Sequence, residues 1–140
     1  MFAGRGDDTL RGGKGSDVLQ GKGGRDLING GKGNDLLYGG KRADTLNGGP
    51  GSDVFVLSKG QDVIADFQLN EDGIGLVNKL DLEFVQVDSD LLIRDAQAGV
   101  ETLLLGVQKD EFLKDYPGNL ELVPAVEVDV VAVRSSAPSL

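Results

Sequence analysis

The sequence predicts an all-β protein in which short parallel strands wind into a coil, and two observations support this prediction. Residues 3–56 contain one nine-residue phrase six times in succession, as AGRGDDTLR, GGKGSDVLQ, GKGGRDLIN, GGKGNDLLY, GGKRADTLN and GGPGSDVFV. The sixth residue of every copy is Asp, and the eighth is a large apolar residue. A fixed period of this kind is typical of proteins built from stacked repeats, each of which contacts only its neighbours.

Each copy divides into a Gly-rich half and a three-residue half in which only the middle residue is apolar. Alternate side chains of a strand point to opposite faces, so the second half predicts a short strand with one inward side chain. The first half predicts a turn, because Gly is costly in regular structure and readily adopts positive φ. Turns and strands in this alternation form a coil with two copies per circuit. The inward side chains form a thin apolar spine of Leu10, Leu19, Ile28, Leu37, Leu46 and Phe55.

This spine is too thin to stabilise the coil by itself. One large apolar side chain per copy contributes about 2 kcal/mol, whereas ordering a copy costs roughly 1–2 kcal/mol for each of its residues. The sixth-position carboxylates offer the missing interaction. Stacking places them in two columns, with Asp8, Asp26 and Asp44 on one edge of the coil and Asp17, Asp35 and Asp53 on the other.

Neighbouring carboxylates in such a column lie about 5 Å apart, which is the spacing of paired strands. They repel one another unless a cation lies between them. A hard divalent cation removes the repulsion and also accepts the Gly carbonyl oxygens that the turns leave unpaired. Calcium fits this donor set best, because it takes about six to eight oxygen ligands in flexible geometry, whereas magnesium demands a tighter octahedron and gives up its waters reluctantly.

The copies resemble the GGxGxDxUx nonapeptides of RTX (repeats-in-toxin) proteins. The resemblance implies a right-handed parallel β-roll in which calcium lies between turn n and turn n+2, held by both sixth-position Asp side chains and by carbonyl oxygens of the Gly positions. It implies roughly four complete sites, which pair Asp8 with Asp26, Asp26 with Asp44, Asp17 with Asp35, and Asp35 with Asp53. The implied main-chain ligands are Gly4, Gly6, Gly12, Gly13, Gly15, Gly21, Gly24, Gly30, Gly31, Gly33, Gly39, Gly40, Gly48, Gly49 and Gly51.

Four positions depart from the ideal phrase. Ala3 and Lys22 replace the first and second Gly of their copies, and Lys22 is still followed by Gly23 and Gly24. Pro50 stands at the variable third position and suits a turn. Arg42 replaces the fourth Gly, where a bulky residue is strained if its φ is positive. Arg42 therefore makes the fifth turn the one that fits the calcium-binding phrase least well.

The segment after the repeats, 60–76, predicts a strand at 62–67, a turn at 69–73 and a strand at 74–77. It resembles the stretch that follows the last nonapeptide in serralysin-type and cyanobacterial RTX proteins. The resemblance implies that Asp62, Asp66 and also Asp72 complete calcium sites at the end of the roll. The alternative is that these acids lie in solvated surface turns.

Residues 58–124 are expected to cap the roll of residues 1–57, because the last coil of a solenoid exposes an open edge and its spine. Strands at 82–87, 90–95 and 101–107 predict an antiparallel meander, and 109–116 predicts a short helix or turn. Its core candidates are Leu82, Phe84, Leu91, Ile93, Leu103 and Leu105. The tail, 125–140, is either an edge strand that could mediate self-association or, as part of 120–140, an uncleaved export signal.

Composition excludes several other functions. The formal charge of −9 and the pI of about 4.4 argue against nucleic acid and anionic lipid as partners, whereas about four divalent cations would nearly neutralise the chain. The chain has no Cys and no His, which excludes disulfides, zinc sites of those ligands, Ser-His-Asp triads and Cys nucleophiles. No apolar run approaches the roughly 20 residues of a transmembrane helix, and the N-terminus lacks the apolar region of a signal peptide.

These observations lead to the expectation of a non-catalytic module that binds and folds on calcium. We expect it to be secreted by a signal-peptide-independent route, with an export machinery as its further partner. One alternative is adhesion through an outer face of the solenoid formed by the seventh residues of the copies. Another is the calcium-stabilised C-terminal part of a larger secreted enzyme or toxin. Acid–base catalysis by Asp62 and Asp66 is a third, for which no further constellation emerges.

Overall fold

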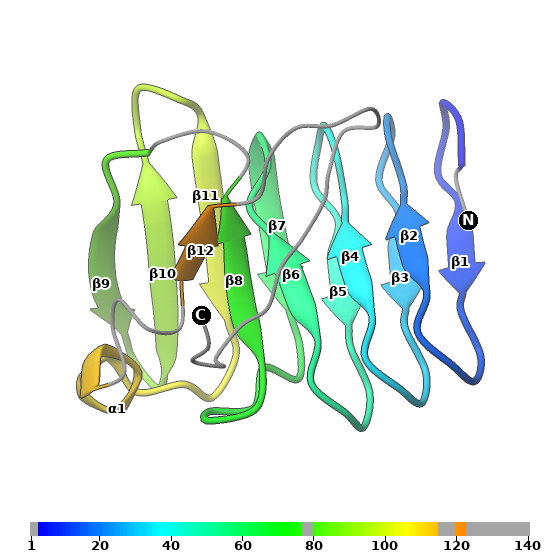
Figure 1. Ribbon diagram of the computed structural model, residues 1–140. Helices are drawn as coiled ribbons and strands as arrows, with labels where there is room; N and C mark the ends of the chain where they lie inside the picture. Colours follow the sequence, from blue (N-terminus) through cyan, green and yellow to red (C-terminus); the bar gives the residue numbers. More distant parts are fainter. Residues whose placement is uncertain (1–2, 77–79, 115–119, 123–140) are drawn as a thin grey trace.

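The computed structural model describes residues 3–76, 80–114 and 120–122, and of residues 120–122 only the main chain. The repeats form short strands that alternate with loops (Figure 1). These strands are β1 (Thr9–Arg11), β2 (Val18–Gln20), β3 (Leu27–Asn29), β4 (Leu36–Tyr38), β5 (Thr45–Asn47), β6 (Val54–Val56), β7 (Gly60–Ile64) and β8 (Gly73–Leu76).

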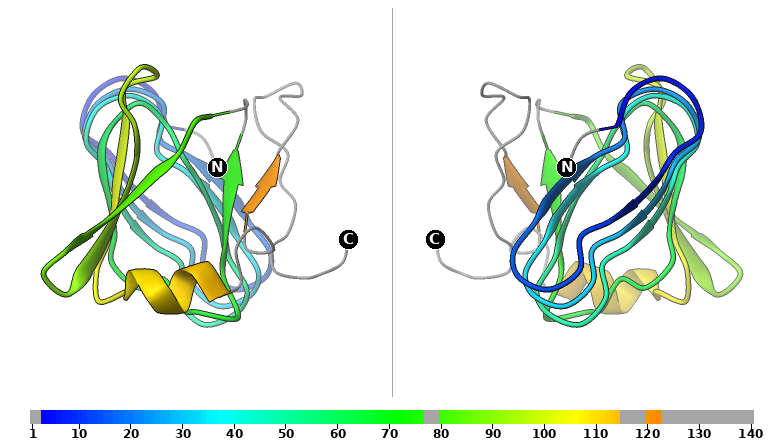
Figure 2. Two further views of the ribbon diagram at one scale, coloured as in Figure 1. Left: turned by 90° about the vertical axis from the view of Figure 1, so that its left-hand side faces the viewer. Right: turned by 90° about the vertical axis from the view of Figure 1, so that its right-hand side faces the viewer.

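The strands build two parallel sheets, because each strand pairs with the strand two places further along the chain. One sheet has the order β1-β3-β5-β7, and the other has the order β8-β6-β4-β2, with β12 (Leu120–Leu122) beside β8. Leu10 pairs with Ile28, and Ile28 pairs with Leu46, so the register advances by two copies per circuit. Successive coils superimpose when the roll is viewed along its length (Figure 2). The predicted parallel β-roll is confirmed.

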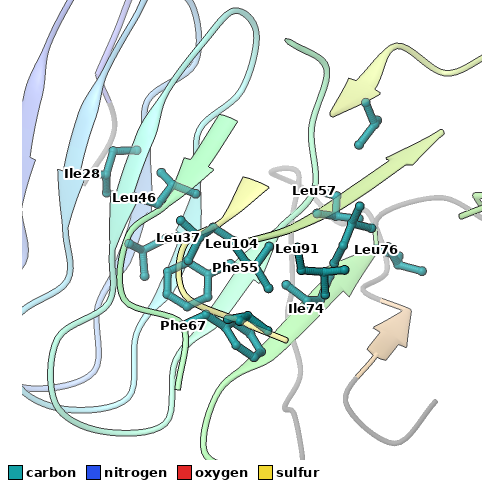
Figure 3. Packing of buried hydrophobic residues seen from close by; sticks show 14 of the residues in the cluster. Ile28, Leu37, Leu46, Phe55, Leu57, Phe67, Ile74, Leu76, Leu91 and Leu104 are labelled. Carbon is teal, nitrogen blue, oxygen red and sulfur yellow. The ribbon is translucent and has the colours of Figure 1, made fainter. Parts of the chain in front are cut away.

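The eighth-position side chains form the spine between the two sheets. All six of them are at most 2% exposed. Ile64 in β7 and Ile74 in β8 continue the spine and are fully buried, and Figure 3 shows Ile28, Leu37, Leu46, Phe55 and Ile74 gathered in this core.

Parallel stacking extends past residue 57, where the sequence analysis places the end of the roll. Val63 of β7 pairs with Thr45, and Ile74 of β8 pairs with Phe55. Residues 57–65, LSKGQDVIA, thus form a seventh copy with Asp62 at its sixth position and Ile64 at its eighth. An eighth copy with a loop one residue longer ends in β8. The strand predicted at 62–67 is observed at Gly60–Ile64, because its residues pair in the register of the repeats.

The cap is an antiparallel sheet of β9 (Glu83–Val87), β10 (Asp90–Asp95) and β11 (Val100–Leu104), in the order β11-β10-β9, followed by helix α1 (Lys109–Lys114). β11 lies along the free edge of β7: the Gly60 N–H donates to the Gly99 carbonyl (2.9 Å), and the Leu105 N–H donates to the Ile64 carbonyl (3.1 Å). The last odd strand of the roll therefore has no exposed edge. Covering this edge is the role expected of the cap.

The inward residues of the cap differ in one strand from those expected. Leu91 and Ile93 of β10 are fully buried, and Leu82 and Phe84 pack against the core, as predicted. In β11 the buried residues are Val100, Thr102 and Leu104, while Leu105 is 39% exposed. The expectation that Leu103 and Leu105 point inward is wrong, because side chains alternate along a strand and a shift by one residue exchanges its two faces.

A chain of aromatic rings joins the roll to the cap. Phe55 at the end of the spine lies 6.0 Å from Phe67, Phe67 lies 5.8 Å from Phe112 of α1, and Phe112 lies 5.8 Å from Phe84 of β9, measured between ring centroids. Phe55 and Phe112 are fully buried. The roll, the antiparallel sheet of the cap and helix α1 therefore share one apolar core.

The seventh residues of the copies do not form one exposed apolar face. Val18 (43% exposed) and Leu27 (38% exposed) lie on different sheets, in β2 and β3, while Leu36 and Val54 are buried. The tail interpretations for 125–140 and for most of 120–140 lie outside the described residues. Among the residues that the structure describes, no helix has the length and apolarity that crossing a bilayer requires.

We expect Phe112→Ala to lower the free energy of unfolding by about 3–5 kcal/mol, because it removes a fully buried ring from the junction of roll and cap. Urea denaturation in saturating calcium measures the change. Val87→Ala is the control, since Val87 is 40% exposed and surface substitutions change stability by about 0.5 kcal/mol or less. A loss below about 1 kcal/mol for Phe112→Ala would show that the cap does not depend on this ring.

Candidate metal centre

The Gly-rich halves form loops with positive φ at the fourth residue of each of the six copies and, from the second to the sixth copy, also at the second residue. In the second copy these are Gly13 (φ 88°) and Gly15 (φ 92°). The corresponding predicted ligand positions with positive φ are Gly6, Gly24, Gly31, Gly33, Gly40, Gly49 and Gly51. Loops of alternate copies stack closely, and a Cβ on Gly33 would meet the carbonyl oxygen of Gly15.

Two copies hold a side chain where the others have Gly. Lys22 has φ 70° and Arg42 has φ 76°. The strain expected at Arg42 is therefore present, and Lys22 shares it, since the neighbouring Gly23 and Gly24 do not relieve the second position. A residue with a Cβ is disfavoured in this region of φ and ψ.

The sixth-position Asp residues form two ladders of carboxylate-to-amide hydrogen bonds. In each step the main-chain N–H of one Asp donates to Oδ1 of the Asp two copies later. The odd ladder runs through Asp8, Asp26, Asp44 and Asp62, with N–O distances of 2.8, 2.7 and 2.9 Å. The even ladder runs through Asp17, Asp35, Asp53 and Asp72, with N–O distances of 2.8 Å throughout. The predicted columns are thus formed, and each is one residue longer than six copies provide.

The second oxygen of these carboxylates has no donor. Oδ2 is buried and without a hydrogen-bond partner in six residues, which are Asp8, Asp17, Asp26, Asp35, Asp44 and Asp53. A buried acceptor without a partner is unfavourable by about 1–3 kcal/mol, and by more if it is charged. Every nonapeptide of the sequence therefore presents one buried oxygen that needs a positively charged or hydrogen-bonding ligand.

The second to sixth copies begin with a Gly that packs tightly against this oxygen, whereas the first copy begins with Ala3. A Cβ on Gly12 would lie 2.6 Å from Oδ2 of Asp17 and 2.6 Å from the carbonyl oxygen of Gly30. Two acceptor oxygens thus lie close together beside Gly12, and Oδ2 of Asp17 has no protein donor. Gly21, Gly30, Gly39 and Gly48 stand in the same relation to the Asp of their own copy.

At the C-terminal ends of the ladders, protein donors satisfy the second oxygen. Oδ2 of Asp62 accepts the Ser58 hydroxyl (3.0 Å), and Oδ2 of Asp72 accepts the Gln68 N–H (2.8 Å). Both carboxylates are at most 2% exposed. Asp62 and Asp72 therefore extend the two ladders by one residue each, and they terminate the two columns of unpartnered oxygens.

Asp66 lies outside both ladders. Its Oδ1 accepts the Gly48 N–H and its Oδ2 accepts the Gly49 N–H, both at 2.8 Å. This carboxylate thus holds the first two residues of the sixth loop by their main-chain amides. Asp62 and Asp66, which the sequence suggested as a pair for acid–base catalysis, therefore have separate roles. Asp62 belongs to the odd ladder, and Asp66 binds the sixth loop.

Burial raises the pKa of the ladder carboxyls, because it removes the charged form from water. The pKa of Asp35 is raised from 3.8 to about 6, that of Asp44 to about 7, and that of Asp53 to about 8. Burial likewise raises the pKa of Asp62 to about 8 and that of Asp72 to about 6. Hydrogen bonds from main-chain amides oppose these shifts, and neighbouring ladder charges add to them. The folded chain therefore favours protons or cations at these oxygens.

The donor set is that of a hard cation. It offers carboxylate and main-chain carbonyl oxygens, which calcium prefers. Within residues 3–76 and 80–114, no group of three or more Asp, Glu, His or Cys side chains is placed to hold a metal ion. A cation on a ladder would accordingly combine one or two Asp side chains with loop carbonyls, as it would between Asp17, Asp35 and the Gly30 carbonyl.

These loops and ladders define a calcium-binding type of β-roll, and the family comparison agrees. A profile of four RTX calcium-binding nonapeptide repeats matches residues 2–37 and 30–64. Residues 2–64 therefore carry RTX calcium-binding nonapeptide repeats. The second match reaches into the seventh copy, LSKGQDVIA, which sequence reasoning did not count. Its signal was Gly60, Asp62 and Ile64 in the fourth, sixth and eighth positions.

Solved structures of other proteins resemble the fold. The crystal structure of the extracellular lipase LipA from Serratia marcescens aligns with a TM-score of 0.66 and 20% identity, over 84% of this chain and 20% of the lipase chain. The solution structure of the AlgE6R3 subunit of the Azotobacter vinelandii mannuronan C5-epimerase aligns with a TM-score of 0.59 and 24% identity, over 97% of this chain and 88% of the other. A search of curated protein sequences found no match.

We expect Gly30→Ala to weaken calcium binding strongly, because its Cβ would lie 2.5 Å from Oδ2 of Asp35 and 2.8 Å from the Gly48 carbonyl oxygen. The calcium midpoint of folding should rise about tenfold or more, equivalent to about 1.4 kcal/mol. Calorimetric or circular dichroism titration measures it. Gly4→Ala is the matched control, since its Cβ would meet no atom within 4 Å. Equal midpoints for the two variants would show that the space beside Asp35 is not a ligand position.

The metal-free protein should lose stability as pH rises from about 5 to 8.5. Asp35, Asp44 and Asp53 have pKa values of about 6, 7 and 8 in the fold against 3.8 ordinarily. Their protonation therefore contributes stability that is complete below pH 3.8 and is lost as pH passes about 6 to 8. Far-UV circular dichroism of protein stripped on a chelating resin, recorded from about pH 5 to 8.5, tests this expectation as a loss of β signal. A β signal that increases with pH across this range would contradict it.

Proposed function

We propose that the chain binds calcium along both ladders and that this binding drives the roll to fold. The observation that carries the proposal is the buried Asp Oδ2 without a donor, which lies close to a loop carbonyl oxygen beside Gly12, Gly21 and Gly30. The unpartnered Oδ2 recurs in all six copies of residues 3–56, which matches the calcium-binding family of the repeats.

The ladder residues explain why folding and binding would be coupled. Asp26, Asp35, Asp44 and Asp53 are at most 4% exposed, and their charged forms are unfavourable when buried without a counter-charge. A bound calcium ion supplies that counter-charge and takes oxygen ligands from the loops. Each interior Asp contacts the copies on both sides through its N–H and its Oδ1, so ordering one loop prepares the next. Binding should therefore be cooperative, because the ligand set exists only in the folded chain.

We further propose that the roll is a structural module of an exported protein and has no catalytic role of its own. The ladder carboxylates have a structural explanation in their amide hydrogen bonds. One structural relative is named as an extracellular lipase, of which the aligned part spans a fifth. On this proposal residues 3–76 form the calcium-dependent roll and residues 80–114 close its end. Low calcium inside a cell would keep the repeats unfolded until export.

Far-UV circular dichroism of the metal-free protein during a calcium titration tests the proposal, with a parallel magnesium titration. We expect a cooperative gain of β signal with calcium, and at most a weak response to magnesium, which prefers a tighter octahedron. A spectrum that is fully β in chelator and does not respond to calcium would overturn calcium-driven folding.

Two ladder variants locate the effect. Asp35→Asn should raise the calcium midpoint more than Asp8→Asn, because Asp35 is 3% exposed and is bonded to copies on both sides, whereas Asp8 is partly exposed in the first copy. Asn keeps the Oδ1 acceptor, so the ladder hydrogen bond is retained while the charge is removed. Equal midpoints for both variants would argue against ladder-bound calcium.

A further inference from the structure

The two edges of the roll carry different charge. The odd edge comprises the loops before β1, β3, β5 and β7, at residues 3–8, 21–26, 39–44 and 57–62. It has six cationic side chains against five carboxylates, and the cations are Arg5, Lys22, Arg25, Lys41, Arg42 and Lys59. The even edge comprises the loops before β2, β4, β6 and β8, at residues 12–17, 30–35, 48–53 and 65–72. It has two cations, Lys14 and Lys32, against six carboxylates.

The cations of the odd edge lie close to its ladder. All six are exposed residues of the same loops whose sixth positions form the odd ladder. Arg5, Lys41 and Arg42 line one open cleft of about 340 Å³ across the first, third and fifth loops, together with Asp7, Gly23 and Gly24. Asp7 contributes one opposing charge there, and its Oδ1 accepts a hydrogen bond from the main-chain N–H of Arg25 at 2.9 Å. A cation that approaches the odd ladder therefore meets positive charge from neighbouring loops.

Backbone strain falls on the same edge. Lys22 and Arg42, the two loop residues of the nonapeptides that have positive φ without being Gly, both belong to odd loops. In the even loops before β2, β4 and β6 the positive-φ positions are Gly throughout, from Gly13 and Gly15 to Gly49 and Gly51. The longer even loop before β8 has Asn70 at φ 70°, and Asn adopts this conformation at lower cost than Lys or Arg. Where binding is coupled to folding, strain in the bound loop reduces the apparent affinity for the ion.

We propose that the even edge binds calcium more tightly than the odd edge and is filled at lower free calcium. The inference rests on the proposed function, and it divides the sites of this roll into two classes. Electrostatic repulsion and loop strain, which are independent of each other, both weaken the odd sites. Affinity of a calcium site depends on the charge and rigidity of its surroundings, and the contribution of the exposed cations is screened by salt.

The experiment is a calcium titration of the full ¹⁵N-labelled chain, followed at the amides that form the ladders. Asp8, Asp26 and Asp44 report on the odd edge, and Asp17, Asp35 and Asp53 report on the even edge. At about 20 mM salt we expect the even amides to reach their calcium-bound signals at a free calcium concentration at least about fivefold lower than the odd amides require. At about 0.5 M KCl the gap should narrow, because screening removes the electrostatic part. Coincident midpoints at low salt, or odd amides that respond first, would overturn the proposal.

Variants separate charge from strain. Arg25→Gln removes charge alone, since Arg25 is not among the positive-φ residues, whereas Arg42→Gly removes both charge and strain. Both variants should lower the free calcium concentration at which the odd-edge amides are half converted, and Arg42→Gly should lower it more. Lys14→Gln on the even edge is the control and should leave the odd midpoints unchanged. Odd midpoints that move with neither Arg25→Gln nor Arg42→Gly would overturn the proposal, whereas a chain whose amides ignore calcium altogether would instead refute the proposed function.

Discussion

The structure depends on one repeated interaction, in which an Asp carboxylate accepts the main-chain N–H of the Asp two copies before it. This bond ties each coil to the next at the point where a loop enters a strand, as between Asp17 and Asp35. It also turns the other carboxylate oxygen inward, away from any donor. The geometry that stacks the coils therefore leaves buried carboxylate oxygens that require a proton or a cation.

The thin spine and the cap follow from this arrangement. Short strands with one inward side chain each bury little apolar area, so the roll alone has a small core. The cap enlarges that core through Phe67, Phe84 and Phe112, and β11 covers the edge that β7 would otherwise expose. Ser58 and Gln68 terminate the ladders with donors from the chain. Apolar packing and hydrogen bonding thus end the roll at the same place.

Charge gives the two edges of an otherwise regular coil different properties. Near-identical loops present the same oxygens, but the side chains at variable positions are mostly cationic on the odd edge, whereas on the even edge they include two cations, Lys14 and Lys32. Because alternate copies lie on the same edge, a residue placed in every second copy accumulates on one side. Because of the nine-residue period, cationic residues placed in alternate copies together set the charge of one edge of the roll.

The sequence by itself determined the coil, its two Asp columns and the spine, because a side chain that recurs every nine residues in strands of three can only stack. It also indicated strain at Arg42 and a capping sheet after the repeats. Only the tertiary structure decided that Asp62 and Asp72 end the ladders and that Asp66 instead holds the sixth loop. These three acids look alike in sequence, and their hydrogen-bond partners come from residues up to 19 positions away. Register decided the inward face of β11 in the same way, since Leu104 rather than Leu103 enters the core through its pairing with β10 and its position beside β7.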